Sequence, residues 1–196
     1  MIITDISQLD LTKQYTYADY LAWRIEERLE LIKGWISRMA APSINHQRVL
    51  RDTFRELDYY FYDHPCDLLF APIDVVFRKE DNNTLIKTVV QPDICVVCDL
   101  TKVVGKICTG APDLVVEILS PGNSKKEMKQ KYEVYEENGV LEYWLVFPEE
   151  KSIQVFVRNE KGKFIGLQPF TEDDILTSTT FPGLNIDLIK VFKNIV

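Results

Sequence analysis

The sequence predicts an α/β fold in which a mixed central sheet is flanked by helices. One observation is a strand–helix–strand unit over residues 112–147, whose two strands are apolar along their whole length. Another is a pair of short strands at residues 29–32 and 35–39, joined tightly enough to run antiparallel. A sheet that contains both kinds of connection is mixed, and the helical patterns between its strands supply the covering layers.

The strand–helix–strand unit has clear boundaries. Its first strand, Leu114 to Leu119, is rich in β-branched residues and is ended by a Pro-Gly pair. Ser124 and Glu127 have the spacing of a capping box, and Gly139 is placed to end the helix after about four turns. The second strand, Leu141 to Phe147, is therefore predicted to lie parallel to the first through a right-handed crossover.

Upstream of this unit, helical and strand patterns alternate. Thr16 is predicted to cap a helix at residues 17–26, and the Lys33-Gly34 turn joins the N-terminal hairpin. A second helix is predicted at residues 43–62, with apolar residues at intervals of three and four. Further strands are expected at residues 66–71, 73–77 and 86–97, the last interrupted by Pro92, with a turn at 80–83 and a loop at 101–110.

The C-terminal part is predicted to add a hairpin and a short helix. The hairpin strands are residues 153–157 and 164–170, and Asn185 or Asp187 opens the helix after a Pro-Gly turn. We expect one domain over residues 1–196, with a core at about 15–150 and the C-terminal hairpin and helix at 151–196.

Composition limits the class of protein. The 196 residues are 46% hydrophobic and 27% charged, as in an ordinary globular protein. No apolar run has transmembrane length and the N-terminus lacks the features of a signal peptide, so a cytoplasmic protein without a membrane partner is expected. The net charge of -7 argues against a general basic coat for nucleic acid. It leaves open a local basic patch, or an acidic site whose charge a metal offsets.

The four cysteines are Cys66, Cys95, Cys98 and Cys108. On a strand, Cys95 and Cys98 point to opposite faces and would not share a zinc ion. Disulfides are an alternative, but we expect all four to be buried free thiols.

Two acidic residues interrupt apolar strands. Glu117 lies on the same face of its strand as Val115 and Leu119, and Asp93 follows Pro92 at the start of another apolar run. Carboxylates that share a site repel, and a hard divalent cation such as Mg²⁺ relieves that cost. If the two strands are neighbours, the acids form a candidate metal site.

With these two acids in their sequence context, the chain resembles the Uma-type restriction-endonuclease family of the PD-(D/E)XK nuclease superfamily. The likeness covers about residues 15–192 and depends on the order and spacing of five segments, LELIKGWISRMAAPSINHQRV, APIDVVF, QPDICVVCD, PDLVVEILSP and KQKYEVYEENGVLEYWLVF. The resemblance implies a restriction-endonuclease-like core, a Mg²⁺ or Mn²⁺ site built from Asp93 and Glu117, and DNA as the partner.

One position departs from the superfamily pattern. The superfamily lysine would stand two residues after Glu117, where this chain has Leu119. The resemblance implies a substitute from the following helix, where Lys131 and Tyr135 match a K-x-x-x-Y pattern and share a helix face. A lysine there could stabilise the attacking water or the charged transition state. Its rivals on the same helix are Lys125, Lys126 and Lys129.

Other polar residues are candidates for auxiliary roles. Glu30 and Asp74 occupy acidic positions that match the family pattern, and each could extend the site or simply hold structure. His46, in the first turn of a helix, is a weaker candidate because such histidines are usually caps or core partners. Asp113 forms a second Pro-Asp pair, but on one strand it would lie roughly 13 Å from Glu117. It is therefore set aside.

Polar donors gather at the start of the crossover helix. Ser120, Ser124 and Lys125 are candidates for binding a phosphate, together with Asn123 and Lys126. Lysines at a helix N-terminus oppose the helix dipole, and a bound phosphate would offset that local cost.

The leading hypothesis is a metal-dependent DNA endonuclease of restriction type that hydrolyses phosphodiester bonds. A homodimer would fit because cutting two strands needs two sites. The first alternative is a non-catalytic nucleic-acid-binding or regulatory protein on the same fold, and the second is a metal-dependent hydrolase of a non-nucleic substrate. Without the family resemblance, the residues support only the inference of a cation-binding acidic pocket on an α/β sheet.

Overall fold

The computed structural model describes residues 2–77, 86–122 and 125–195. Its helices in these ranges are α1 (Tyr17–Ala22), α2 (Ile44–Phe61), α3 (Lys125–Asn138) and α4 (Leu188–Phe192), with 3-10 turns η1 (Ile6–Gln8) and η2 (Leu100–Lys102). None of them is both long enough and apolar enough to cross a membrane. The predicted turn at residues 80–83 and the predicted cap Ser124 lie outside the described residues.

Two mixed sheets carry most of the strands. The first sheet has the order β2 (Trp35–Arg38), β1 (Leu29–Ile32), β5 (Thr88–Val90), β4 (Asp74–Phe77), β8 (Ile107–Thr109) and β7 (Val103–Val104). Only β4 and β8 are parallel in this sheet as described.

The second sheet has the order β12 (Phe164–Gly166), β11 (Ser152–Arg158), β10 (Glu142–Phe147), β9 (Leu114–Ile118), β6 (Ile94–Val97) and β3 (Asp67–Phe70). The short strand β13 (Phe170–Thr171) also pairs with β11, and β14 (Ile175–Thr177) pairs with β15 (Asn185–Asp187) in a separate ribbon. Strands β9 and β10 are parallel and joined by α3, so the predicted strand–helix–strand unit and the α/β class are confirmed.

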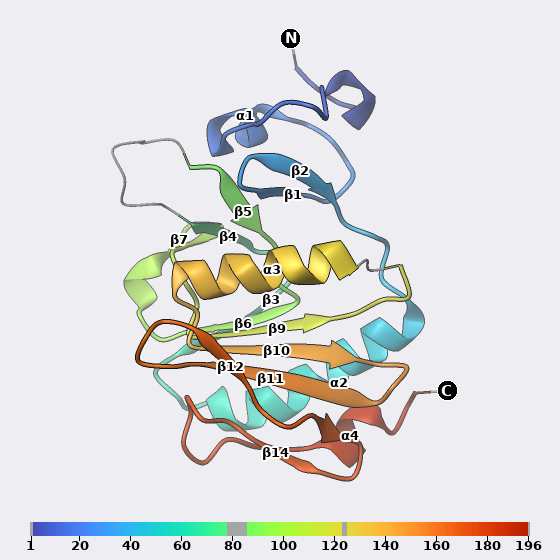
Figure 1. The fold of residues 1–196 in the computed structure, drawn as a ribbon, viewed down its shortest axis with the longest axis vertical. Coiled ribbons are helices and arrows are strands. Elements are labelled where there is room, and N and C mark those ends of the chain that lie inside the picture. The colour runs from blue at the N-terminus through green and yellow to red at the C-terminus, as the bar shows by residue number, and fades with distance from the viewer. Residues whose placement is uncertain (1, 78–85, 123–124, 196) are drawn as a thin grey trace.

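The two sheets separate three apolar cores, and helices cover the second sheet on both faces. Figure 1 shows α3 across one face of the second sheet and α2 behind the other face. On the α3 side, Tyr135 shares an apolar cluster with residues of both sheets, and its ring lies against Phe77 of the first sheet and Tyr143 of the second. The helix therefore fills the space between the two sheets. On the other side, α2 and α4 pack against the alternate residues of β9 and β10, and the N-terminal segment covers the far face of the first sheet.

Local chemistry explains where the elements begin and end. The Thr16 hydroxyl accepts a hydrogen bond from the Asp19 N–H, and the Asp19 carboxylate accepts one from the Thr16 N–H, which starts α1 with a capping box. This helix ends at Ala22 rather than at the predicted residue 26, because Trp23 has extended backbone angles and is buried in the core. In the predicted hairpin, Lys33 and Gly34 have φ of 54° and 88°, as a two-residue turn between β1 and β2 requires.

Three details differ from the prediction. The strand region interrupted at Pro92 is divided between the two sheets, because β5 pairs with β1 and β4 whereas β6 pairs with β3 and β9. The loop expected at residues 101–110 contains η2, β7 and β8. The ribbon of β14 and β15 was not predicted, although the short final helix begins after Asp187 as expected. Short strands without alternation give too weak a pattern to be recognised.

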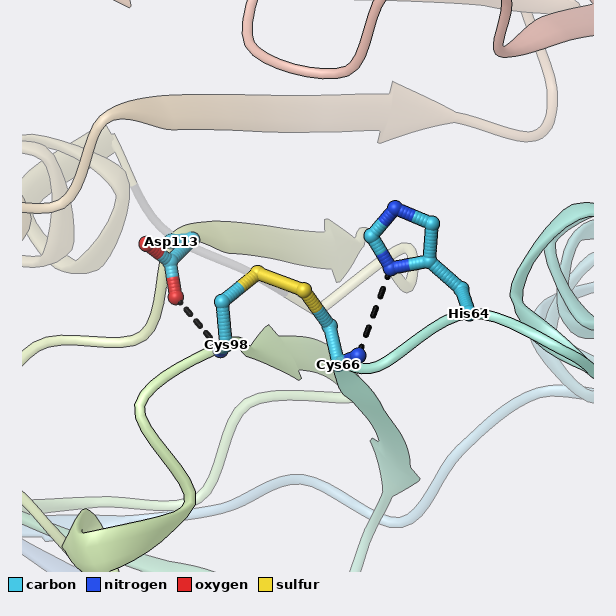
Figure 2. The surroundings of a disulfide bond; sticks show 4 residues. All are labelled: His64, Cys66, Cys98 and Asp113. Carbon is cyan, nitrogen blue, oxygen red and sulfur yellow. Dashed lines mark hydrogen bonds between the residues drawn. A yellow bond between two sulfur atoms is a disulfide. The ribbon is translucent and has the colours of Figure 1, made fainter.

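The prediction that all four cysteines are free was wrong for two of them. Cys66 and Cys98 form a disulfide that joins the start of β3 to the end of β6, as Figure 2 shows. Strand pairing explains the bond, since Asp67 lies opposite Val97 and the cysteines are the next pair. The Cys66 N–H donates to His64 Nδ1 and the Cys98 N–H donates to the Asp113 carboxylate. Cys95 and Cys108 are buried free thiols, as expected.

Removing this disulfide is expected to lower the free energy of unfolding by about 2–4 kcal/mol. The bond closes a loop between residues 32 positions apart, and this reduces the conformational entropy of the unfolded chain. The measurement is urea unfolding of the Cys66→Ala, Cys98→Ala double variant against the oxidised wild type. The reduced wild type should unfold near the same midpoint as the double variant. Equal midpoints for the oxidised wild type and the double variant would contradict the expectation.

Candidate active site

A pocket of about 260 Å³ opens where β1 and β2, the first turns of α2, and α3 meet near β6 and β9. Its lining includes six of the candidate site residues, namely Glu30, His46, Asp93, Glu117, Ser120 and Lys131. The side chains come from segments far apart in the chain, so the pocket is a product of the tertiary fold.

Strand register places the two central acids side by side. In the antiparallel pair of β6 and β9, Ile94 lies opposite Val116, and the next step sets Asp93 opposite Glu117. Because side chains alternate along a strand, both acids face the α3 side of the sheet. Each acid is only 7% exposed.

Asp93 is fixed through one oxygen. Its Oδ2 accepts a hydrogen bond from the Ile118 N–H at 2.8 Å and lies 3.1 Å from His46 Nε2. His46 is held in place because the Ser43 hydroxyl accepts from its N–H and caps α2. Among the described residues, Oδ1 of Asp93 has no hydrogen-bond partner, so this oxygen is available to a ligand.

Glu117 is held in a similar way. Its Oε1 accepts hydrogen bonds from Lys131 Nζ, at 2.8 Å, and from the Tyr135 hydroxyl. The two donors stand one helical turn apart on α3, which is the shared face expected for the pair. Oε2 of Glu117 has no hydrogen-bond partner within the described part of the chain.

Lys131 bridges two buried acids. Its Nζ lies 2.9 Å from Glu30 Oε1 as well as 2.8 Å from Glu117 Oε1. Glu30 Oε1 also accepts from the Gln91 N–H at 2.8 Å. Because Glu30 shares the face of β1 that carries Ile32, it points toward α3 and not toward the N-terminal core.

Burial and charge shift the pKa values of this cluster. Burial raises the pKa of Glu117 to about 7, and the Asp93 and Glu30 carboxylates add to that effect against the opposing charge of Lys131. Burial would lower the pKa of Lys131, but the carboxylates of Glu117 and Glu30 outweigh it and hold that pKa above its ordinary value. Burial, with the same two carboxylates, raises the pKa of Tyr135 well above 10. Lys131 and Tyr135 therefore keep their protons at neutral pH and serve as donors.

The raised pKa of Glu117 predicts a specific dependence of stability on pH. Between its ordinary pKa of 4.5 and about 7, the folded protein holds this proton and the unfolded chain releases it. Stability from this group therefore falls as pH rises through that range. The free energy of unfolding of the wild type, relative to Glu117→Gln, is expected to fall by about 3 kcal/mol from pH 4.5 to 7.5. A constant difference between the two urea-unfolding curves at all pH values would contradict this.

The structure does not bring every candidate into the pocket. Asp74 Oδ1 accepts hydrogen bonds from Gln91 Nε2 at 2.9 Å and from the Tyr20 hydroxyl at 3.3 Å, and Asp74 does not line the pocket. Lys125 is exposed at the start of α3, and Ser124 lies outside the described residues. Asp113 binds the Cys98 N–H away from the pocket, in agreement with its being set aside.

Three polar residues at the site were not singled out in the sequence. Gln91 links the cluster, since its side chain joins Asp74 to Arg28 and its N–H joins Glu30. Arg28 and Arg38 also line the pocket. The one available signal was the position of Gln91, a polar residue directly before the Pro-Asp pair at the end of an apolar strand.

The residues present fit a divalent cation. Asp93 and Glu117 each keep one oxygen without a hydrogen-bond partner within the described ranges, and both acids line the same pocket. No three His, Cys, Asp or Glu side chains in those ranges are grouped closely enough to hold an ion by themselves. Mg²⁺ is commonly bound by one or two carboxylates, with water and substrate phosphate completing its six ligands. The donor set therefore suits a metal that is shared with a phosphate substrate.

Comparisons with known proteins identify the family and the fold of this chain. The model of the Uma2 family, described as "Putative restriction endonuclease", matches residues 17–189. An uncharacterised protein of Synechocystis sp. is 25% identical over 178 residues, which cover 87% of this chain and 88% of that protein. The crystal structure of "a putative nuclease belonging to DUF820" from Anabaena variabilis is similar with a TM-score of 0.74 and 17% identity, over 93% of this chain and 99% of that one. At that identity the structural likeness shows the fold.

Proposed function

This chain belongs to the Uma2 family of restriction-endonuclease-like proteins, and we propose that it is a Mg²⁺- or Mn²⁺-dependent DNA endonuclease that hydrolyses phosphodiester bonds. The observation that carries the proposal is the convergence of Asp93, Glu117 and Lys131 in one pocket. The family match supports a nuclease, and the geometry supplies the parts that metal-dependent hydrolysis requires.

Asp93 and Glu117 would hold the cation through the oxygens that the protein leaves without hydrogen bonds. A cation held there would lower the pKa of a water molecule and stabilise charge on the phosphoryl oxygen. Ile118 and His46 fix one oxygen of Asp93, while Tyr135 and Lys131 fix one oxygen of Glu117. The free oxygens are thus oriented before substrate arrives, which reduces the reorganisation that the reaction needs.

Lys131 takes the place of the superfamily lysine, whose usual position is occupied by Leu119 in this chain. Leu119 lines the pocket on the same face as Glu117, and the Lys131 ammonium reaches Glu117 from α3 instead. A charged donor at this position would orient the attacking water and stabilise the negative charge that develops on the phosphate. Glu30 holds the second side of the ammonium and so directs it.

The test is a cleavage assay on supercoiled plasmid, linear duplex and circular single-stranded DNA. Nicked or linear products are expected with Mg²⁺ or Mn²⁺ and none with EDTA. Failure to cut any of these substrates with either metal would refute the proposal and favour a non-catalytic DNA-binding protein. Gel filtration of the same sample measures whether the active form is a homodimer, as a protein that cuts both strands would need.

Lys131→Met is expected to lower the single-turnover rate of cleavage about 10²–10³-fold, because the ammonium acts on charge that appears in the transition state. The control is Lys129→Met on the same helix, whose side chain is 78% exposed and pairs only loosely with Glu133. Thermal melting shows whether each variant is folded. A folded Lys131→Met protein that cuts at the wild-type rate would remove Lys131 from the mechanism.

A further inference from the structure

A second cavity continues from the acid pocket. It is lined by Leu11, by residues of the β1–β2 pair and by three residues of the first half of α3, among them Lys126. The acid pocket shares four of these residues, namely Ile32, Ser37, Arg38 and Glu127. The two cavities therefore adjoin and form one groove between the β1–β2 pair and the first half of α3, with Arg38 at their junction.

Two arginines lie one register step apart at the adjoining ends of the two strands that form the wall of this groove. Arg38 lies opposite Leu29 in the β1–β2 pair, and one step further the Met39 N–H donates to the Arg28 carbonyl. Both arginines are exposed and both line the acid pocket.

The guanidinium groups keep most of their donors available. Arg28 Nε donates to Gln91 Oε1 at 2.9 Å, which holds the group and leaves its terminal nitrogens without an ion pair in the described structure. Arg38 likewise forms no ion pair with any described residue. Asp5, whose carboxylate is bound to the Ser7 N–H, interacts with Arg38 only through longer-range charge.

The pocket is rich in acidic side chains, so binding a phosphate there needs added positive charge. Glu30, Asp93 and Glu117 face a single lysine, and Glu127 adds a further acid at the edge of the groove. Even with a divalent cation bound, such a surface attracts a phosphate weakly. The chain as a whole has a net charge of -7, so it offers no general attraction for a polyanion.

We propose that Arg28 and Arg38, with Lys126 at the far end of the groove, bind backbone phosphates of the DNA strand beside the bond that is cut. This inference rests on the proposed nuclease function and names the residues that position its substrate. Arginine suits the task because its planar fork of donors matches two phosphate oxygens. Contacts to phosphates position the DNA and carry no sequence information, so the groove should treat different sequences alike.

The experiment measures DNA binding apart from cleavage. Fluorescence anisotropy with two fluorescein-labelled 20-base-pair duplexes of unrelated sequence is recorded in Mg²⁺ from 50 to 300 mM NaCl. All proteins carry Glu117→Gln, which is expected to prevent cutting. The comparison is between this parent and the added substitutions Arg38→Ala, Arg28→Ala and, as a control, Arg55→Ala, an exposed α2 arginine that lines neither cavity.

Arg38→Ala and Arg28→Ala are each expected to weaken binding about three- to tenfold at the lowest salt concentration. Each should also reduce the slope of log affinity against log salt concentration by about 1, equally for both duplexes. Arg55→Ala should change neither. Because Arg28→Ala also frees Gln91, the Arg38 variant decides the question.

An unchanged slope in Arg38→Ala, or a loss confined to one duplex, would overturn the inference and leave the nuclease proposal standing. A parent that binds neither duplex would also overturn it. The nuclease proposal is tested separately, by the cleavage assay with wild-type protein.

Discussion

Asp93→Asn and Glu117→Gln are each expected to lower Mg²⁺-dependent DNA cleavage by at least about 10³-fold. Each substitution keeps the shape of the side chain and removes the negative charge that would hold the cation. A metal ion contributes several kcal/mol of transition-state stabilisation, and about 4 kcal/mol corresponds to a factor of 10³ in rate. The measurement is the single-turnover rate on plasmid DNA at saturating protein.

The chain offers a matched control for this experiment. Asp113 is the aspartate of the second Pro-Asp pair, but its carboxylate accepts the Cys98 N–H and does not line the pocket. Asp113→Asn should cut within a few-fold of wild type. Cleavage that persists in both Asp93→Asn and Glu117→Gln would point to a contaminating nuclease or to another site, and the proposed mechanism would be wrong.

Glu142→Ala is expected to lower the free energy of unfolding by about 3–4 kcal/mol. This carboxylate is fully buried on β10, and it accepts the indole N–H of Trp144 at 2.7 Å. Its other oxygen accepts the Ser178 hydroxyl and the N–H groups of Thr179 and Thr180, at 2.8 to 3.0 Å. Truncation leaves the buried indole N–H of Trp144 and three partly buried donors without this acceptor, and a buried donor left unpaired costs about 1–3 kcal/mol.

Urea unfolding of Glu142→Ala and of Glu149→Ala, an exposed residue just after the same strand, measures this effect. The control should lose less than about 0.5 kcal/mol. A loss below about 1 kcal/mol in Glu142→Ala would mean that water or nearby groups replace the carboxylate. The Glu142 side chain does not line the pocket, so its loss should affect folding first and cleavage only through folding.

Local sequence signals were sufficient for the central unit. The apolar run Leu114 to Leu119, the following breaker and Gly139 predicted β9, α3 and β10 to within one or two residues. The parallel pairing followed from the single crossover helix. The interruption of one apolar strand by Glu117 drew attention to the site, because an acid there needs a compensating partner.

The surroundings of Glu117 depended on tertiary structure and could not be read in advance. Helical spacing placed Lys131 and Tyr135 on one face, but it could not show that Lys131 turns inward to bridge Glu117 and Glu30. Glu30 reaches that point from the other sheet, and no pattern in the chain predicts how two sheets stack. The pairing of β3 with β6 was equally hidden, which is why the Cys66–Cys98 bond was missed.

The link between the sheets has a consequence for judging relatives of this protein. Only Gln91, Pro92 and Asp93 separate the end of β5 from the start of β6. These few residues supply the amide that clamps Glu30 and the acid that faces Glu117. A single residue inserted between Asp93 and Ile94 would move the aspartate one step along the strand, and its side chain would then face the opposite side of the sheet from Glu117. An aspartate directly before this strand therefore separates homologues that can share the chemistry from those that share only the scaffold.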